Sequence, residues 1–133
     1  MNPISYPTFR YYYKYFADSN NSVKVIEATG GAVSSTTYVS DNDVVISIDV
    51  PGNYLLLFNS AVNVQSSQTM SAAWFKNGVE VPFTERTTTT TAGIMTLVGF
   101  ANLAEGDVLE VKKKVSGGTT TLGNKHGMAI RLY

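Results

Sequence analysis

Residues 44–64 read VVISIDVPGNYLLLFNSAVNV, and this stretch decides the fold. In its first part apolar residues alternate with other residues, which predicts a strand with one buried face. Pro51-Gly52-Asn53 then breaks the pattern. Residues 54–58, YLLLF, are apolar on both faces of an extended chain, so the second strand is predicted to be covered on both faces. Such a strand lies either at the centre of a sandwich or against another subunit.

Further strand and turn signals follow along the chain. Asn77-Gly78, between two apolar runs, predicts a two-residue hairpin turn. Residues 103–107 predict a turn in which Gly106 supplies the unusual backbone angle. Residues 108–115 predict a strand whose three lysines, at 112–114, mark an end in solvent or a sheet edge, and residues 127–133 predict the last strand. No segment has the period of a useful amphipathic helix, so the sequence predicts an antiparallel sandwich or barrel.

The order of four sequence blocks resembles that of the globular heads of complement-type and tumour-necrosis-factor-like proteins. The blocks are VPGNY (50–54), FKNG (75–78), LAEGD (103–107) and the closing MAIRLY (128–133). The resemblance covers residues 40–133 and implies an all-β, antiparallel jelly-roll sandwich of ten strands that forms a homotrimer around an axis. It also implies binding or assembly, because such heads are rarely enzymes. Heads of this kind occur on bacteriophage fibres, capsid decorations and spore-surface proteins.

Composition and charge exclude several classes of partner. A chain of 133 residues is long enough to bury a core as one domain, and it has no cysteine. Its charged fraction is 15%, against about 25% in typical soluble domains, and its formal net charge is zero. A neutral chain without 18 consecutive apolar residues is not suited to nucleic acid or to a membrane span, so neither is expected as a partner. The first residues show no signal-peptide core, which predicts synthesis in a host cytoplasm.

Residues 1–22 differ from the rest, and we treat them as an N-terminal arm before a head domain at 23–133. The arm holds two prolines and a cluster of aromatic residues, namely Phe9, Tyr11, Tyr12, Tyr13, Tyr15 and Phe16. Two interpretations remain open. The arm is either a first strand folded onto the domain or a segment that docks on a partner or a neighbouring subunit. Stacking on nucleic acid is disfavoured, because two cations, Arg10 and Lys14, supply too little positive charge to bind along a phosphate backbone.

The sequence offers little support for catalysis or metal binding. The single histidine, His126, precedes the predicted last strand and is interpreted as a loop residue. Asp41-Asn42-Asp43 has oxygen ligands of the kind that calcium prefers, but the spacing of a calcium loop is missing. Glu80 and Glu85 are interpreted as surface residues, and Trp74 as a core residue. No catalytic residue, metal ligand or cofactor is therefore predicted.

These observations lead to a prediction of function. We expect a non-enzymatic structural protein of a bacteriophage virion, acting as a trimeric assembly and adhesion module with capsid or fibre proteins as partners. The alternative is a carbohydrate- or receptor-binding module, for which a host surface glycan is a possible partner. The predicted trimer interface consists of Tyr54, Leu55, Leu57, Ile130, Leu132 and Tyr133.

Overall fold

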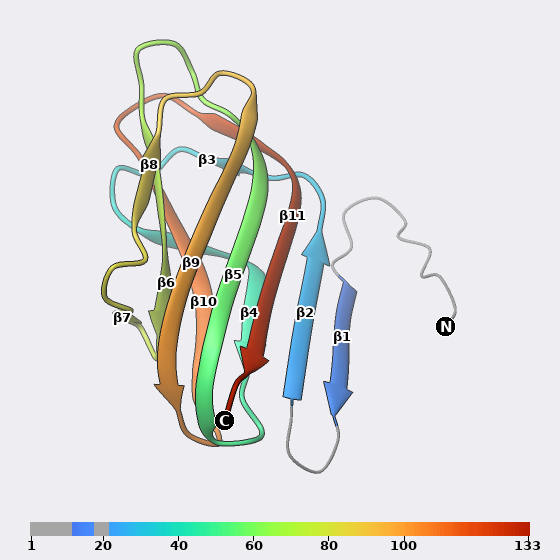
Figure 1. Cartoon of the computed structure of the whole chain (residues 1–133). Coiled ribbons are helices and arrows are strands. Elements are labelled where there is room, and N and C mark those ends of the chain that lie inside the picture. The colour runs from blue at the N-terminus through green and yellow to red at the C-terminus, as the bar shows by residue number, and fades with distance from the viewer. Residues whose placement is uncertain (1–11, 18–21) are drawn as a thin grey trace.

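The computed structural model describes residues 12–17 and 22–133, with the backbone alone for 12–17, 22, 41 and 42. Its described residues form a sandwich of two antiparallel sheets, shown in Figure 1. The first sheet has the order β1 (Tyr12–Ala17), β2 (Ser22–Ala28), β11 (Thr120–Arg131), β5 (Gly52–Asn63) and β9 (Gly93–Leu103), and β3 (Ala32–Val33) pairs with β11. The second sheet has the order β4 (Val39–Ser47), β10 (Val108–Val115), β6 (Met70–Lys76) and β7 (Val79–Glu80), and β8 (Arg86–Thr88) pairs with β6. Among the described residues, no helix is long and apolar enough to span a membrane.

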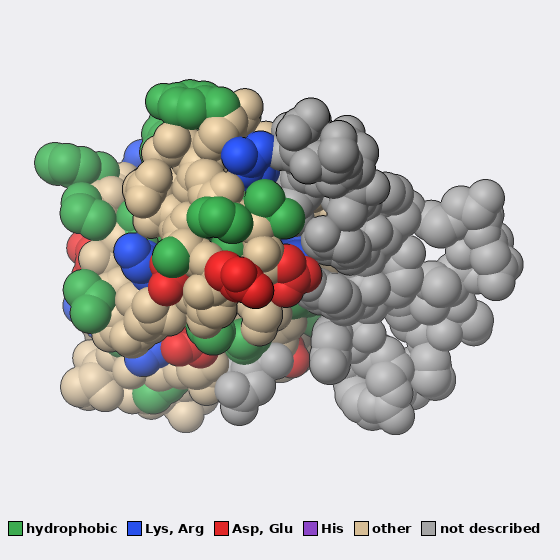
Figure 2. All heavy atoms as spheres, turned by 90° about the horizontal axis from the view of Figure 1, so that it is seen from below, with side chains coloured by type: hydrophobic (Ala, Val, Ile, Leu, Met, Phe, Trp, Pro, Cys, Tyr) green, Lys and Arg blue, Asp and Glu red, His purple; other side chains and the backbone are tan. Residues whose placement is uncertain are grey.

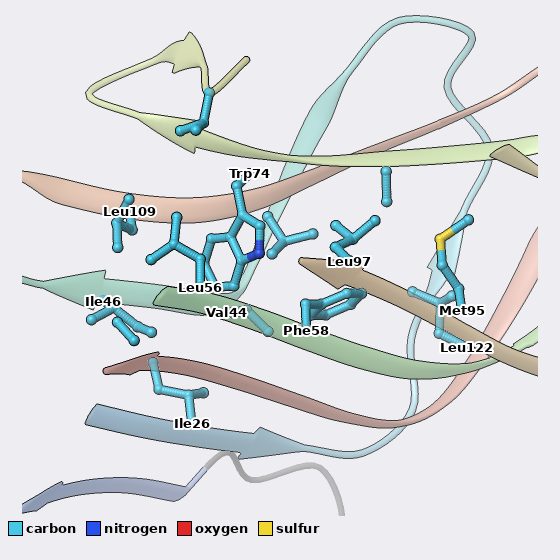
Figure 3. Close-up of a cluster of buried hydrophobic side chains, with 14 of the residues drawn as sticks. Ile26, Val44, Ile46, Leu56, Phe58, Trp74, Met95, Leu97, Leu109 and Leu122 are labelled. Atoms are coloured by element: carbon cyan, nitrogen blue, oxygen red, sulfur yellow. The ribbon is translucent and has the colours of Figure 1, made fainter. Parts of the chain in front are cut away.

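The hydrophobic core lies between the two sheets, as Figure 3 shows. Alternation along β5 turns Tyr54, Leu56 and Phe58 inward, where they are buried. Trp74 of the second sheet is also fully buried, and its ring meets that of Phe58 edge to face at 6.5 Å between centroids. The interpretation of Trp74 as a core residue is therefore confirmed.

The last strand is longer than the sequence suggested. β11 begins at Thr120 and pairs with β2 on one side and with β5 on the other. The interpretation of His126 as a loop residue is therefore wrong, because it lies within this strand opposite Glu27 and Asn59. Gly123, Asn124, Lys125 and Gly127 have weak strand propensity, but pairing with β2 and β5 holds this part of β11 in the sheet.

The three lysines of β10 do not mark a sheet edge, so that prediction is also wrong. β10 lies between β4 and β6, and Lys113 is 0% exposed, with its Nζ 5.7 Å from the centre of the Phe58 ring. Lys112 and Lys114 point to the other face, where their ammonium groups lie over the rings of Phe75 and Tyr38 at 5.0 and 4.5 Å. Aromatic partners on both faces allow lysines to occupy a central strand.

Two buried lysines of the first sheet reach across the sandwich to the strand β4 and the residues after it. Lys24 Nζ donates to the Ser47 carbonyl and to Asp49 Oδ2, the latter at 2.7 Å. Lys125 Nζ donates to Asp43 Oδ2. Both ammonium groups are thus paired with carboxylates, as buried charges require. They tie the two sheets together on the side where β2 and β11 face β4.

The turn before β10 is held by side-chain hydrogen bonds. Asp107 Oδ2 accepts from the backbone N–H of Ala104 at 2.8 Å, and Asp107 Oδ1 accepts from Asn77 Nδ2 at 2.9 Å. These hydrogen bonds, that of Ala104 first, hold the pKa of Asp107 below its usual value. Gly106 has a φ of 91°, as predicted for this turn. The interpretation of residues 103–107 as turn chemistry is confirmed.

Asn77-Gly78 joins β6 to β7 as a two-residue hairpin turn, with φ values of 50° and 85°, which confirms the prediction. We expect Gly78→Val to lower the free energy of unfolding by about 1–3 kcal/mol, because a β-branched residue resists positive φ. A Cβ at this position would meet no atom within 4 Å, so the effect isolates the backbone. Thermal unfolding should show this loss, whereas Gly78→Asn, which tolerates the same φ, should lose much less. Equal melting temperatures for the valine variant and the parent would contradict the expectation.

Candidate interaction surface

The outer face of the first sheet is apolar over four adjacent strands. Because inward and outward side chains alternate, the pairing register places outward residues of β2, β11, β5 and β9 in two parallel rows. One row runs Val25, Met128, Leu57, Val98, and the next runs Val23, Ile130, Leu55, Phe100. We call these eight residues the apolar band. The core lies on the opposite face. Exposure of the band increases across the sheet, from 8% at Val25 to 41% and 67% at Val98 and Phe100.

A polar row borders the apolar band on the same face. It consists of Glu27, His126, Asn59 and Thr96, again brought together by the register of the four strands. Thr96 Oγ1 donates to Asn59 Oδ1 at 2.8 Å. Beyond this row lies a hollow of about 330 Å³, which Glu27, Asn59 and His126 help to line. The band thus has a defined limit at one end.

The edge of the sandwich beside β9 carries further exposed apolar residues. Within the described residues β9 pairs with β5 alone, so its other side is an edge. Phe100 is 67% exposed there, and Val79 and Phe83 are 70% and 93% exposed on the neighbouring part of the second sheet. We call Val79, Pro82 and Phe83 the edge cluster. A hollow of about 390 Å³, lined by Pro82, Phe83, Val98, Gly99 and Phe100, joins it to the apolar band.

The outer face of the second sheet has a different character. Tyr38 packs edge to face on Phe75 at 5.2 Å between centroids, and its hydroxyl donates to Glu85 Oε2. Burial, together with Glu85, raises the pKa of Tyr38. Lys114 and Lys112 cover these rings with their charges. Charged and polar groups of the chain itself thus close this face, whereas Val98 and Phe100 of the apolar band are 41% and 67% exposed.

Viewed from its lower end, the sandwich shows acidic side chains near the middle of the described surface and hydrophobic side chains reaching the surface at several places around them (Figure 2). Leu132 and Tyr133, at the C-terminal end of the chain, are among the exposed hydrophobic residues. They line a hollow of about 360 Å³ together with Asn53 and Phe100. This end of the chain therefore extends the apolar surface that begins at Phe100.

The predicted interface residues fall into three groups in the structure. Leu55, Leu57 and Ile130 belong to the apolar band, and Leu132 and Tyr133 are exposed beside Phe100. Tyr54 differs, because alternation turns it inward, where it is 1% exposed and its hydroxyl donates to the Val50 carbonyl at 2.5 Å. Its side chain thus presents no surface to a partner.

Sequence reasoning missed several members of this surface. Val98, Phe100 and Met128 were not predicted as interface residues. The alternation of residues 94–100, IMTLVGF, carries the signal: every second residue from Ile94 to Phe100 faces outward, and three of those four are apolar.

The aromatic arm falls only partly within the described residues. Tyr12, Tyr13, Tyr15 and Phe16 lie in β1, which pairs antiparallel with β2 at the edge of the first sheet. The backbone at 12–17 thus forms a strand of the sandwich. Phe9 and Tyr11 lie outside the described residues, and docking of the arm on a partner stays a prediction.

Nothing in the described part of the chain assembles a metal centre. No group of three or more histidine, cysteine, aspartate or glutamate side chains is placed there to hold an ion. Of the Asp41-Asn42-Asp43 run, the Asp43 carboxylate contacts Lys125, while the side chains of 41 and 42 lie outside the described residues.

Comparison with known proteins supports the fold. No protein-family model and no curated protein matches the chain. Among solved structures, Eiger TNF from S. frugiperda matches with a TM-score of 0.51 and 11% identity, over 94% of this chain and 93% of that one. Murine APRIL at pH 5.0 matches with a TM-score of 0.47 and 14% identity, over 78% of this chain and 98% of that one. A carbohydrate-binding module of Cellvibrio mixtus lichenase 5A, solved with cellotriose, has a TM-score of 0.37 and 14% identity, over 92% and 87%.

The likeness to Eiger, together with the two antiparallel sheets, confirms the predicted jelly-roll sandwich of the tumour-necrosis-factor-like kind. The described residues contain eleven strands, whereas the resemblance implied ten, and two of the eleven, β3 and β7, are only two residues long.

Proposed function

We propose that this chain is a non-enzymatic structural protein of a bacteriophage virion, which forms a homotrimer and serves as an assembly and adhesion module. The observation that carries the trimer is the apolar band, eight apolar residues in register on the sheet face opposite the core, of which all but Val25 are partly or largely exposed in the described structure. Exposed contiguous apolar patches of this kind mark interaction sites in soluble proteins.

The form of the surface favours a closed ring over a two-fold dimer. The apolar band lies on a sheet face, whereas the edge cluster lies on the sandwich edge beside β9. Contact between two different surfaces is heterologous, and a heterologous contact that closes generates a cyclic oligomer. A trimer in which the edge of one copy covers the band of the next buries both surfaces in every copy.

The energy of burial is of the right size for such an assembly. Full burial of one large apolar side chain contributes about 1.5–3 kcal/mol. Association costs about 4–15 kcal/mol in lost freedom of the partners. Several side chains of the apolar band and the edge cluster must therefore be buried together, which a contact of edge against face would achieve.

Light scattering after size exclusion tests the oligomeric state. The chain has a mass of 14.4 kDa, and the proposal expects a particle of three times that mass at micromolar concentration. A stable monomer would contradict the trimer.

The assignment to a virion rests on the low charge of the chain and on its aromatic N-terminal arm. A head fibre, a capsid decoration or a tail-fibre head would each suit these features, with capsid or fibre proteins as partners. Mass spectrometry of purified particles, together with antibody labelling in electron microscopy, tests the assignment. A gene that lies apart from capsid and tail genes, and a product absent from particles, would refute it.

A second candidate function is carbohydrate or receptor binding. A groove of about 520 Å³ beside β9 is lined by Phe100, Val79 and Pro82 and by the polar side chains of Lys76, Asn77, Glu80 and Asn102. Aromatic and polar groups side by side suit hydroxylated ligands such as glycans. Binding on a glycan array that is lost in Phe100→Ser while the trimer persists would favour this candidate. Loss of the trimer in the same variant would favour assembly.

The arm gives a separate prediction. We expect removal of residues 1–11 to leave a folded sandwich that no longer attaches to its partner in the particle. The reason is that tyrosine and phenylalanine are enriched at protein–protein interfaces. Circular dichroism checks the fold, and incorporation into particles checks attachment. If the shortened chain fails to fold, residues 1–11 of the arm belong to the sandwich, as residues 12–17 do, and the docking interpretation is wrong.

A further inference from the structure

Phe83 has an unfavourable backbone conformation. Its φ is 64°, in the left-handed region, where a bulky side chain is rarely found. The other non-glycine residues with positive φ in the described part of the chain are Asn77, which tolerates this region, and the small residue Ser67. Phe83 is also 93% exposed, so its ring gains almost no burial within the chain.

The neighbouring residue explains how the turn is held. Thr84 is fully buried, and its Oγ1 donates to the Val81 carbonyl at 2.8 Å and accepts from the backbone N–H of Trp74 at 3.1 Å. Its methyl group lies over Gly99 of β9, where a Cβ would come within 2.4 Å of it. Thr84 thus fixes the turn against both sheets. Arg86 Nη1 adds a hydrogen bond to the Glu85 carbonyl at 2.8 Å.

This anchoring sets the position of the Phe83 ring. With Thr84 pointing inward between the sheets, the preceding side chain projects from the sandwich edge. Phe83 lies there with Val98 and Phe100 around one hollow, so it is continuous with the apolar band. Glycine or asparagine would satisfy the backbone better at this position. Folding of the single chain therefore gives no reason for an aromatic residue, whereas a contact with a second copy does.

We propose that the turn at residues 82–85 is the docking element of the assembly, and that the Phe83 ring of one copy packs on the apolar band of the next copy. The proposal rests on the proposed trimer and assigns to it a specific contact. A rigid aromatic residue held outward is a suitable anchor, since such residues dominate binding free energy at interfaces.

Two glycine variants test the proposal. Each relieves a positive φ, but only one of them removes the exposed ring. Phe83→Gly removes the ring, and Ser67→Gly is the matched control at an exposed position on a different turn. In sedimentation equilibrium we expect Phe83→Gly to raise the dissociation constant at least about tenfold, which is about 1.4 kcal/mol. Ser67→Gly should associate like the parent. Neither variant should lower the melting temperature measured under conditions in which all proteins are monomeric.

A photo-crosslinking residue at position 83 locates the contact. We expect crosslinks between copies to peptides that contain the outward residues of β11 and β5, such as Met128 and Leu57. Crosslinks elsewhere on the partner, or an unchanged dissociation constant for Phe83→Gly in a parent that is trimeric, would overturn the assignment of Phe83 and leave the trimer standing. A monomeric parent would overturn the proposed trimer itself.

Discussion

Leu57→Asp is expected to convert the proposed trimer into a folded monomer. Leu57 lies in the middle of the apolar band, directly opposite Met128 on one side and Val98 on the other. In the free chain its side chain is partly exposed on the outer face, so an aspartate there remains in contact with water. In the assembly the same carboxylate would be buried against apolar side chains without a partner, which costs about 2–5 kcal/mol at an interface.

This loss corresponds to a rise of at least about thirtyfold in the dissociation constant. Sedimentation velocity measures the oligomeric state, and far-UV circular dichroism checks that the sheets persist. Asn59→Asp is the matched control, because Asn59 lies two residues along the same strand, on the same face, in the polar row. Its oxygen already accepts a hydrogen bond from Thr96, as an aspartate also would. If both variants remain trimeric, the apolar band is not the subunit interface.

The arrangement of the sheets could be predicted because turn chemistry and alternation are local signals. Asn77-Gly78 adopts two positive φ values, and Gly106 adopts a third, as their positions in the sequence require. Residues 54–58 were predicted to be covered on both faces. One face does pack in the core, whereas the other, with Leu55 and Leu57, is only partly covered within the chain. The sequence cannot distinguish a face covered by the same chain from one covered by another copy.

Predictions failed where long-range contacts override local composition. The lysines at 112–114 were predicted to mark an end in solvent or a sheet edge, but Lys113 is buried inside the sandwich, with its Nζ 5.7 Å from the centre of the Phe58 ring. The last strand was predicted to begin at residue 127, with His126 in the preceding loop, although β11 begins at Thr120 and pairing with β2 and β5 holds this segment in the sheet. Tyr54 was placed at the interface with its neighbours Leu55 and Leu57, whereas the phase of the strand puts it on the opposite face.

For the same reason, only part of the candidate surface could be predicted from the sequence. A single strand shows which of its residues share a face, and this suffices for Leu55 and Leu57. The apolar band exists because four strands from distant parts of the chain place their apolar residues in register. Register is set by turns and by the buried pattern of the whole sheet, and it is not a property of any one segment.

Gly127 shows how close packing of the two sheets constrains a single position, and it gives a strong prediction for stability. It lies in β11 between Ile26 and Phe58, and it faces the second sheet. A Cβ at this position would be 2.4 Å from Val44 Cγ1 and 3.7 Å from Trp74 Cη2. We expect Gly127→Ala to lower the free energy of unfolding by about 1–3 kcal/mol, because the added methyl group overpacks the core.

The physical cause can be separated from a general loss of stability by a double-mutant cycle. Val44→Ala removes the methyl group that blocks the new Cβ, and alone it should also destabilise the core by leaving a cavity. Combined with Gly127→Ala, the two changes compensate in volume, so the double variant should be more stable than the sum of the single losses by about 1 kcal/mol or more. Urea unfolding at one fixed protein concentration measures all four proteins. If the stability losses of the two single variants were strictly additive, a Cβ at position 127 would not clash with Val44. The two sheets would then be less closely packed there than the geometry indicates.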